Sequence, residues 1–229
     1  ANEDAPTLDV DTSGVDFKHI KAELDLPGLL KTGSVNTARE KAATRRVQEW
    51  LNIHDCVTSI DGDFGASTET QLRAFQTKSS RAVTGELDAE TWALLTAPMR
   101  RALAVADHGA SPSLESAVLT VARQHIKERP VEIGGNNRGP WVRLYMRGRD
   151  GSDQLWCAGF SCLIAAQAAR DLGSKMPFPR QVSVDALVKD AKASGRFVRE
   201  SEVGDPIARK SRIPPGSLFV VRRTSTDWT

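Results

Sequence analysis

Apolar side chains recur at helical spacing through the first half of the chain. Val47, Trp50 and Leu51 stand at positions i, i+3 and i+4, which is the pattern of one buried helical face. Two glycine-containing turns then separate two further apolar pairs, each spaced by three. These pairs are Leu72 with Phe75 and Trp92 with Leu95. The pattern predicts three helices within residues 36–98.

Polar residues mark where two of these helices begin. Thr68 and Gln71 have the spacing of a capping box, in which both side chains satisfy free N–H groups of the first helical turn. Asp88 precedes the third helix and is expected to be its N-cap. The second helix is therefore predicted to begin near Thr68 and the third directly after Asp88.

The second half of the chain changes from helical patterns to extended ones along its length. Four helices are predicted, over residues 114–126, 141–145, 156–169 and 182–193. The third of them is the most apolar run in the sequence and is expected to be buried. Residues 196–198 and 218–221 are typical of short strands.

Length and composition indicate two domains in an ordinary globular chain. At about 150 residues per domain, 229 residues fit one or two. We expect a lead-in, a three-helix domain, a linker and a second domain. Their ranges are 1–35, 36–98, 99–112 and 113–229. The hydrophobic fraction of 40% and the charged fraction of 26% exclude a disordered or fibrous chain.

Charge and hydropathy narrow the choice of partners. The 31 basic and 29 acidic residues give a net charge of +2 without a basic block, so no nucleic-acid partner is expected. No stretch approaches the ~18 apolar residues of a membrane span, so no membrane partner is expected. No signal peptide is visible, and the start at Ala1 indicates processing or a fragment. We expect a monomer.

The cysteines indicate neither a disulfide framework nor a metal site. Cys56, Cys157 and Cys162 are few and odd in number, and the last two lack the pair-plus-pair spacing of zinc ligands. No metal and no cofactor are expected.

A specific set of motifs fills residues 39–98. They are Val47-Gln48 with Leu51, Asp61-Gly62-x-Phe64-Gly65, Thr68-x3-Leu72-x2-Phe75-Gln76, Val83-Thr84-Gly85-x-Leu87 and Thr91-Trp92-x2-Leu95. This segment resembles the three-helix peptidoglycan-binding domain of bacterial and phage wall hydrolases. The resemblance implies peptidoglycan as the partner.

Five residues at the turns are the candidate peptidoglycan-binding residues, namely Asp61, Gly62, Phe64, Gly65 and Gln76. The glycines let the backbone turn where a Cβ would clash, Phe64 is expected to plug the helix junction, and Gln76 presents an amide. Both a fold-holding role and direct ligand contact are open, since concave turns between helices also bind small ligands.

Motifs of a second kind lie beyond residue 113. They are Asn137-Arg138-Gly139-Pro140-x-Val142-x2-Tyr145, Trp156-Cys157-Ala158-Gly159-Phe160-Ser161 and Pro215-Gly216-Ser217-Leu218-Phe219. This part resembles the CHAP and NlpC types of cysteine amidase and peptidase, which cut stem peptides or the amide joining them to glycan. The resemblance implies an α+β fold: an all-α three-helix bundle followed by a papain-like α+β domain.

Cys157 is the candidate nucleophile. A helix N-terminus favours the thiolate, which is the reactive form, and the Cys157 N–H is a candidate oxyanion-hole donor. A buried core cysteine is the competing interpretation. Cys162 lies further into the predicted helix and is assigned to the core, and Cys56 is expected to be inert.

The catalytic base is the missing part. A cysteine nucleophile needs a histidine within hydrogen-bond reach, yet all four histidines precede Cys157. In the families that this segment resembles, the histidine follows the nucleophile, so we expect the chain to end just before it and to be nearly inactive. His125 as the base and a degenerate, non-catalytic domain are the alternatives.

Four further residues are candidates for substrate binding: Asn136, Asn137, Arg138 and Trp156. Arginine can bind a stem-peptide carboxylate with two hydrogen bonds, and Trp156 can form a cleft wall. An ordinary turn and a core aromatic are the competing interpretations. Glu132 is a further polar candidate beside the cysteine, although carboxylates on loops usually face solvent.

The sequence therefore predicts a peptidoglycan hydrolase of the endolysin or autolysin kind. It acts at the cell wall, in the periplasm or outside the cell, and its wall-binding domain raises the local concentration of enzyme. The alternative is a non-catalytic peptidoglycan-binding or structural protein. The bond that is cut can be an amide within the stem peptide or the amide that joins the peptide to glycan, because the same nucleophile can attack both.

Overall fold

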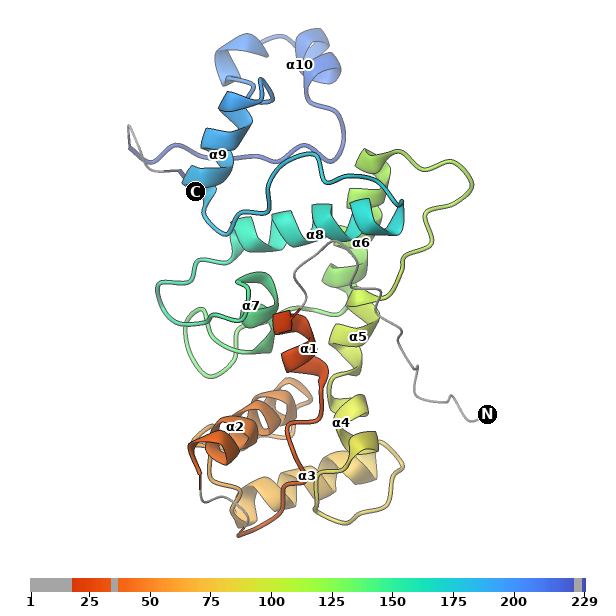
Figure 1. Ribbon diagram of the computed structural model, residues 1–229, viewed down its shortest axis with the longest axis vertical. Helices are drawn as coiled ribbons and strands as arrows, with labels where there is room; N and C mark the ends of the chain where they lie inside the picture. The colour runs from red at the N-terminus through yellow and green to blue at the C-terminus, as the bar shows by residue number, and fades with distance from the viewer. Residues whose placement is uncertain (1–17, 34–36, 225–227) are drawn as a thin grey trace.

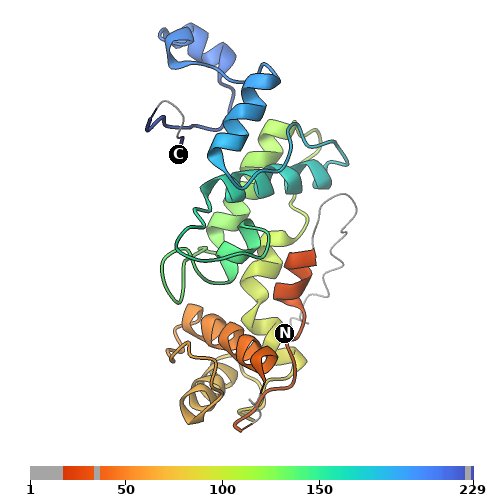
Figure 2. The ribbon, with the colours of Figure 1, turned by 60° about the vertical axis from the view of Figure 1, so that its left-hand side comes forward.

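The computed structural model describes residues 18–33, 37–224 and 228–229. Within these residues the chain forms ten α-helices and one short 3-10 helix (Figure 1). They are α1 Lys18–Leu24, α2 Ala38–Ile53, α3 Ala66–Lys78, α4 Ala89–Leu95, α5 Ala97–Leu103, α6 Leu114–Lys127, α7 Pro140–Tyr145, α8 Cys157–Asp171, α9 Val184–Ala193, η1 Glu200–Glu202 and α10 Pro206–Arg212. The molecule is elongated, with α2 and α3 at one end and α9 and α10 at the other, as Figures 1 and 2 both show.

The expected α+β fold of the second domain is wrong. The described residues hold no strand and no sheet, and their β-type pairing is confined to two isolated bridges, Leu30 with Leu87 and Arg222 with Trp228. A strand needs a neighbour that satisfies its backbone N–H and C=O groups. In the predicted strand at 218–221, Val221 pairs with Thr229, which supplies one point of attachment rather than a ladder.

The other predicted strand, at residues 196–198, is replaced by the turn that ends α9. The backbone N–H groups of Arg196 and Phe197 both donate to the carbonyl oxygen of Ala191, at 2.8 and 3.2 Å. These bonds fold residues 196–198 back onto the carboxyl end of α9. Phe197 packs against the distant Trp228, with the two rings 5.4 Å apart, and does not enter a sheet.

The three helices predicted in residues 36–98 are confirmed as α2, α3 and α4. Asp88 is the N-cap of α4, and its side chain accepts a hydrogen bond from the N–H of Thr91. The expected capping box at Thr68 is wrong, because α3 begins after Gly65. A true capping box instead starts α2, between Thr37 and Glu40.

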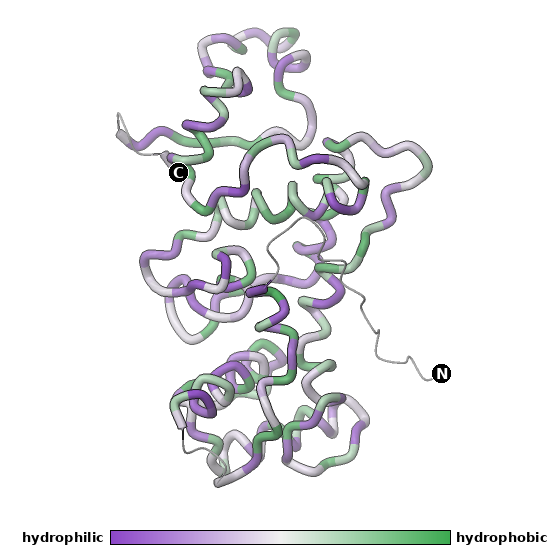
Figure 3. The backbone as a smooth tube through the Cα atoms, in the orientation of Figure 1, coloured by the Kyte–Doolittle hydropathy of each residue, from purple (hydrophilic) through white to green (hydrophobic). Residues whose placement is uncertain are grey.

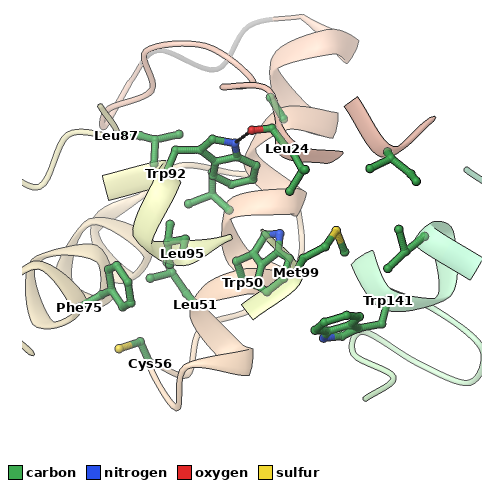
Figure 4. Close-up of a cluster of buried hydrophobic side chains, with 14 of the residues drawn as sticks. Leu24, Trp50, Leu51, Cys56, Phe75, Leu87, Trp92, Leu95, Met99 and Trp141 are labelled. Atoms are coloured by element: carbon green, nitrogen blue, oxygen red, sulfur yellow. Dashed lines mark hydrogen bonds between the residues drawn. The ribbon is translucent and has the colours of Figure 1, made fainter. Parts of the chain in front are cut away.

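The core of this bundle continues into the rest of the molecule. Figure 4 shows Trp50 and Trp92 among the buried side chains that join α2 and α4, with the indole N–H of Trp92 donating to the carbonyl of Leu24 at 2.9 Å. Trp141 of α7 belongs to the same cluster and lies 6.2 Å from Trp50, ring to ring. Residues 97–103, which overlap the predicted linker, form α5 and bury Met99 and Leu103.

The helices predicted at 114–126, 141–145, 156–169 and 182–193 are confirmed as α6, α7, α8 and α9. Small and branched side chains let α6 and α8 approach closely, with Ala117 and Val121 packed on Ile164 and Ala168. Hydrophobic residues recur along α8 in Figure 3, and most of that helix is buried. None of the helices in the described ranges has the length and hydropathy that crossing a membrane requires.

Candidate functional site

The turn at residues 61–65 is closed from inside by one buried amide. Gln48 of α2 donates from Nε2 to the Asp61 carboxylate and the Asp63 carbonyl, both at 2.9 Å, and to the Thr68 hydroxyl at 3.1 Å. Its Oε1 accepts the N–H of Gly62 at 2.9 Å. The glutamine therefore satisfies polar groups that the turn would otherwise leave buried without partners.

Gln76 of α3 repeats this arrangement at the next turn. Its Nε2 donates to the hydroxyls of Thr84 and Thr91 and to the Glu86 carbonyl, at 3.1, 3.3 and 3.1 Å. Its Oε1 accepts the N–H of Gly85 at 2.9 Å. The bundle thus contains an internal structural repeat, a helix whose buried glutamine ties down the turn that follows it.

Most of the five candidate wall-binding residues hold this fold. Gly62 has a φ of +83°, and an added Cβ would lie 2.9 Å from the Lys41 carbonyl oxygen, so only glycine fits. Phe64 and Gln76 are buried, and Gly65 is the N-cap of α3. Asp61 is the exposed member, and hydrogen bonds from the Asp63 N–H and from Gln48 lower the pKa of its carboxyl group.

Cys157 lies where the sequence places it, at the first position of α8, and it is exposed. No side chain caps this helix, and its first backbone bond runs from the N–H of Phe160 to the carbonyl of Trp156 at 2.8 Å. The positive end of the helix dipole and the free N–H groups of the first turn are therefore next to the thiol.

A close helix crossing sets the position of this first turn. A Cβ on Gly159 would lie 2.5 Å from the carbonyl oxygen of Tyr145, at the end of α7. The missing side chain lets α8 approach the backbone of α7. Because Cys157 lies two residues before Gly159, this close contact also sets the distance between Cys157 and the end of α7.

An aromatic stack lies beneath the thiol-bearing turn. The ring of Trp156 is stacked on that of Tyr145, 5.3 Å away and inclined by 9°, and Tyr145 is stacked in turn on Trp141 at 6.3 Å. Phe160 meets Tyr145 edge to face at 5.1 Å. Trp156 is half-buried, so its indole serves both as packing and as accessible surface beside Cys157.

The other candidate substrate-binding residues lie in the loop before α7 and differ in their exposure to solvent. Asn136 and Arg138 are exposed, whereas Asn137 is buried with a φ of +50°. The side-chain amide of Asn137 donates to the Ser152 carbonyl at 3.0 Å, and the backbone carbonyl of Asn137 accepts the Gly151 N–H at 2.7 Å. Asn137 therefore joins two loops, and Asn136 and Arg138 are the members free to meet a ligand.

Each of the four histidines has a ring nitrogen bonded elsewhere in the fold. His19 contacts the Leu144 carbonyl at 3.2 Å and His54 contacts the Leu95 carbonyl at 2.8 Å. His108 pairs with Asp171, which ends α8 and therefore lies about 21 Å along the helix from Cys157.

His125, the alternative base, is fully buried. Its two ring nitrogens contact the Tyr145 hydroxyl at 3.1 Å and the Gln167 Oε1 at 3.0 Å. Because Gln167 uses its Nε2 to donate to the Ala102 carbonyl, its Oε1 accepts from His125, and the other ring nitrogen accepts from Tyr145. Burial lowers the pKa of His125 to about 4, so the ring is neutral.

The remaining cysteines lie in the interior, and burial raises the pKa of both thiols. Cys162 is fully buried and Cys56 nearly so. No group of three or more His, Cys, Asp or Glu residues in the described ranges is arranged to hold a metal ion.

A buried ion cluster, which no sequence pattern indicated, joins the two halves of the chain. Arg143 of α7 pairs with Glu23 at 2.7 Å, with Asp150 at 2.9 Å and with Glu49 of α2. Burial alone would lower the pKa of Arg143, but the surrounding carboxylates outweigh this effect and raise it. Single charged residues far apart in sequence gave no signal. The role of Gln48, in contrast, was detectable from its similarity to Gln76.

Comparison with known proteins identifies the bundle. Residues 40–95 match the family described as "Putative peptidoglycan binding domain". The chain therefore carries a peptidoglycan-binding domain, which spans α2, α3 and α4. No curated protein and no solved structure matches the chain. The resemblance of the later residues to cysteine amidases stays a prediction that rests on their motifs.

Proposed function

We propose that this protein binds peptidoglycan through residues 40–95 and uses the Cys157 thiol to cleave an amide of the bound wall. The observation that carries the proposal is the exposure of Cys157 at the uncapped amino end of α8. The matched wall-binding domain supplies the substrate class. The site of action is accordingly the cell wall, in the periplasm or outside the cell.

The proposed reaction is acyl transfer in two steps. The Cys157 thiolate attacks the amide carbonyl carbon, the C–N bond breaks, and the nitrogen leaves as an amine after gaining a proton. Water then attacks the thioester, which releases a carboxylate and restores the thiol. The proposed donor to the oxyanion of each tetrahedral intermediate is the Cys157 N–H at the helix terminus.

Proton transfer to the leaving amine limits the rate of hydrolysis that we expect from these residues. Because each histidine is bonded elsewhere, the leaving amine takes its proton from water. General acid–base catalysis typically contributes about 10²–10⁴-fold, so slow turnover is expected. The engaged histidines also favour the second candidate function, which is peptidoglycan binding without hydrolysis.

Incubation of the chain with insoluble peptidoglycan separates the two functions. We expect the wild type and Cys157→Ala to sediment equally with the wall. Only the wild type should release soluble fragments slowly, and their masses identify which amide is cut. Equal release by both proteins, or none by either, overturns the hydrolase and leaves the binding protein. Failure to sediment overturns wall binding.

A further inference from the structure

Glu132 is exposed to solvent, yet both of its carboxylate oxygens bind other parts of the chain. Oε1 accepts the indole N–H of Trp156 and Oε2 accepts the backbone N–H of Asn137, both at 2.8 Å. These partners lie 24 and 5 residues away in the sequence. One carboxylate therefore joins the loop before α7 to the segment that leads into α8.

The bond to Trp156 acts on the residue directly before Cys157. The indole is held on its face by the Tyr145 ring and at its edge by Glu132. Trp156 is also the N-cap of α8, so its peptide group leads directly into the first helical turn. The ring of the residue that precedes Cys157 is therefore held on two sides, by stacking and by a hydrogen bond.

The bond to Asn137 acts on a loop that is also bonded to residues 150–152, through Asn137 and through the N–H of Gly139. Gly134, Gly135, Asn137 and Gly139 all have positive φ, so this loop loses much conformational entropy when it is ordered. The Glu132 carboxylate and a backbone bond from the Ile133 N–H to the Arg138 carbonyl, at 3.0 Å, hold it. The loop carries Asn136 and Arg138, the exposed candidates for substrate contact.

We propose that Glu132 is a positioning residue, which fixes Trp156 and the 134–139 loop around the amino end of α8 and so orients the Cys157 thiol. This inference rests on the proposed role of Cys157 as the nucleophile. Glu132 acts as the anion, because hydrogen bonds from Trp156 and from the Asn137 N–H lower the pKa of its carboxyl group.

Two readouts test this role without measuring hydrolysis. One is the NMR resonance of the Trp156 indole N–H, assigned with Trp156→Phe and followed from pH 7 into the acid range. The other is the rate of Cys157 alkylation by iodoacetamide, measured by peptide mass spectrometry. Glu90→Gln on α4 is the matched control, since Glu90 is exposed and pairs with Arg81 rather than with Trp156.

Removing the carboxylate should release both partners. In Glu132→Ala we expect the indole resonance to shift and the alkylation rate to change by about two- to fivefold, as the thiol is no longer held in one position at the helix terminus. Glu132→Gln keeps an acceptor for the indole but not for both partners, so it should restore the resonance in part. His125, which is bonded to Tyr145, also takes up a proton in the acid range and does so in both proteins. The part of the acid-induced change in the resonance that comes from protonation of Glu132 should therefore be present in the wild type and absent from Glu132→Ala.

The outcomes separate this role from the proposed function. An unchanged indole resonance and alkylation rate in Glu132→Ala overturn the positioning role, and if that variant is unfolded, the same result in Glu132→Gln does so. If these shifts occur but Cys157→Ala releases wall fragments as fast as the wild type does, the hydrolase fails while the positioning of the thiol stands.

Discussion

Two glutamines show how much of the wall-binding domain depends on single buried amides. Gln48 and Gln76 each bind a glycine N–H and the polar groups of the following turn. Gln76 therefore has a structural role rather than a peptidoglycan-binding one, because its amide is buried and makes its hydrogen bonds inside the fold.

Gln76→Ala should destabilise the domain by about 3 kcal/mol, because it leaves the Gly85 N–H and the Thr91 hydroxyl buried without this partner. Denaturant unfolding measures the change. Gln71→Ala, on a half-buried side chain of the same helix, is the control and should cost well under 1 kcal/mol. Equal losses in the two variants would contradict the role assigned to Gln76.

His125 predicts how stability depends on pH. Its folded pKa of about 4 lies below the ordinary 6.5, so the unfolded state takes up the proton first as the pH falls. The neutral ring therefore contributes to the free energy of unfolding in full above pH 6.5. This contribution is lost between pH 6.5 and 4, to a limit of about 3 kcal/mol. Glu128 and Arg170 also face the ring, with opposite effects on its charge.

Urea unfolding at pH 7 and pH 4.5 measures this loss. His125→Gln keeps a polar side chain in the network and should reduce the difference between the two pH values. An equally steep pH dependence in His125→Gln would assign the effect to other groups.

At the scale of elements, the crossing of α7 and α8 depends on the absence of a side chain at Gly159. Gly159→Ala places a Cβ 2.5 Å from the Tyr145 carbonyl, so α8 must move away from α7. Because overpacking costs typically about 1–3 kcal/mol, we expect a loss of that size together with a changed rate of Cys157 alkylation. Thermal unfolding and alkylation measure the two effects.

Gly204→Ala is the control for this prediction. Its added Cβ meets nothing within 4 Å, and its backbone has no positive φ. Stability and alkylation should both stay near those of the wild type. If Gly159→Ala is as harmless, the crossing does not position the thiol.

Helices were predictable from the sequence because their pattern and hydrogen bonds are local. The apolar spacing of Val47, Trp50 and Leu51 sufficed for α2, and the side chain of Asp88 sufficed for the start of α4. The strands predicted at 196–198 and 218–221 do not form, since a ladder depends on a partner that the segment itself does not encode. The position of Cys157 was predictable, whereas its fixation by Glu132 and Gly159 came from contacts distant in sequence.

At the scale of the whole molecule, the wall-binding bundle and the thiol-bearing region form one continuous body. Arg143 joins Glu49 of the bundle to Asp150, and Asp150 also accepts the N–H of Gly139 at 3.1 Å. The same region shares a hydrophobic cluster with Trp50. When the bundle binds the wall, it should therefore hold the Cys157 thiol at a fixed distance from the bound peptidoglycan.

Arg143→Met tests this continuity. It leaves the buried Glu49 carboxylate without its cation, and breaking a buried ion pair costs about 3–5 kcal/mol. Calorimetry should show one transition for the bundle and α5–α8 of the wild type and a lowered midpoint in the variant. Arg123→Met, at an exposed position on α6, should leave the midpoint nearly unchanged. Two independent transitions in the wild type would contradict the single body.

The role of Cys157 as the nucleophile is tested by the mass of the Cys157 peptide after the protein has been mixed with peptidoglycan and quenched in acid. We expect a thioester of a wall-derived acyl group on Cys157, which hydroxylamine removes. An unmodified Cys157 in protein that has sedimented with the wall would contradict it.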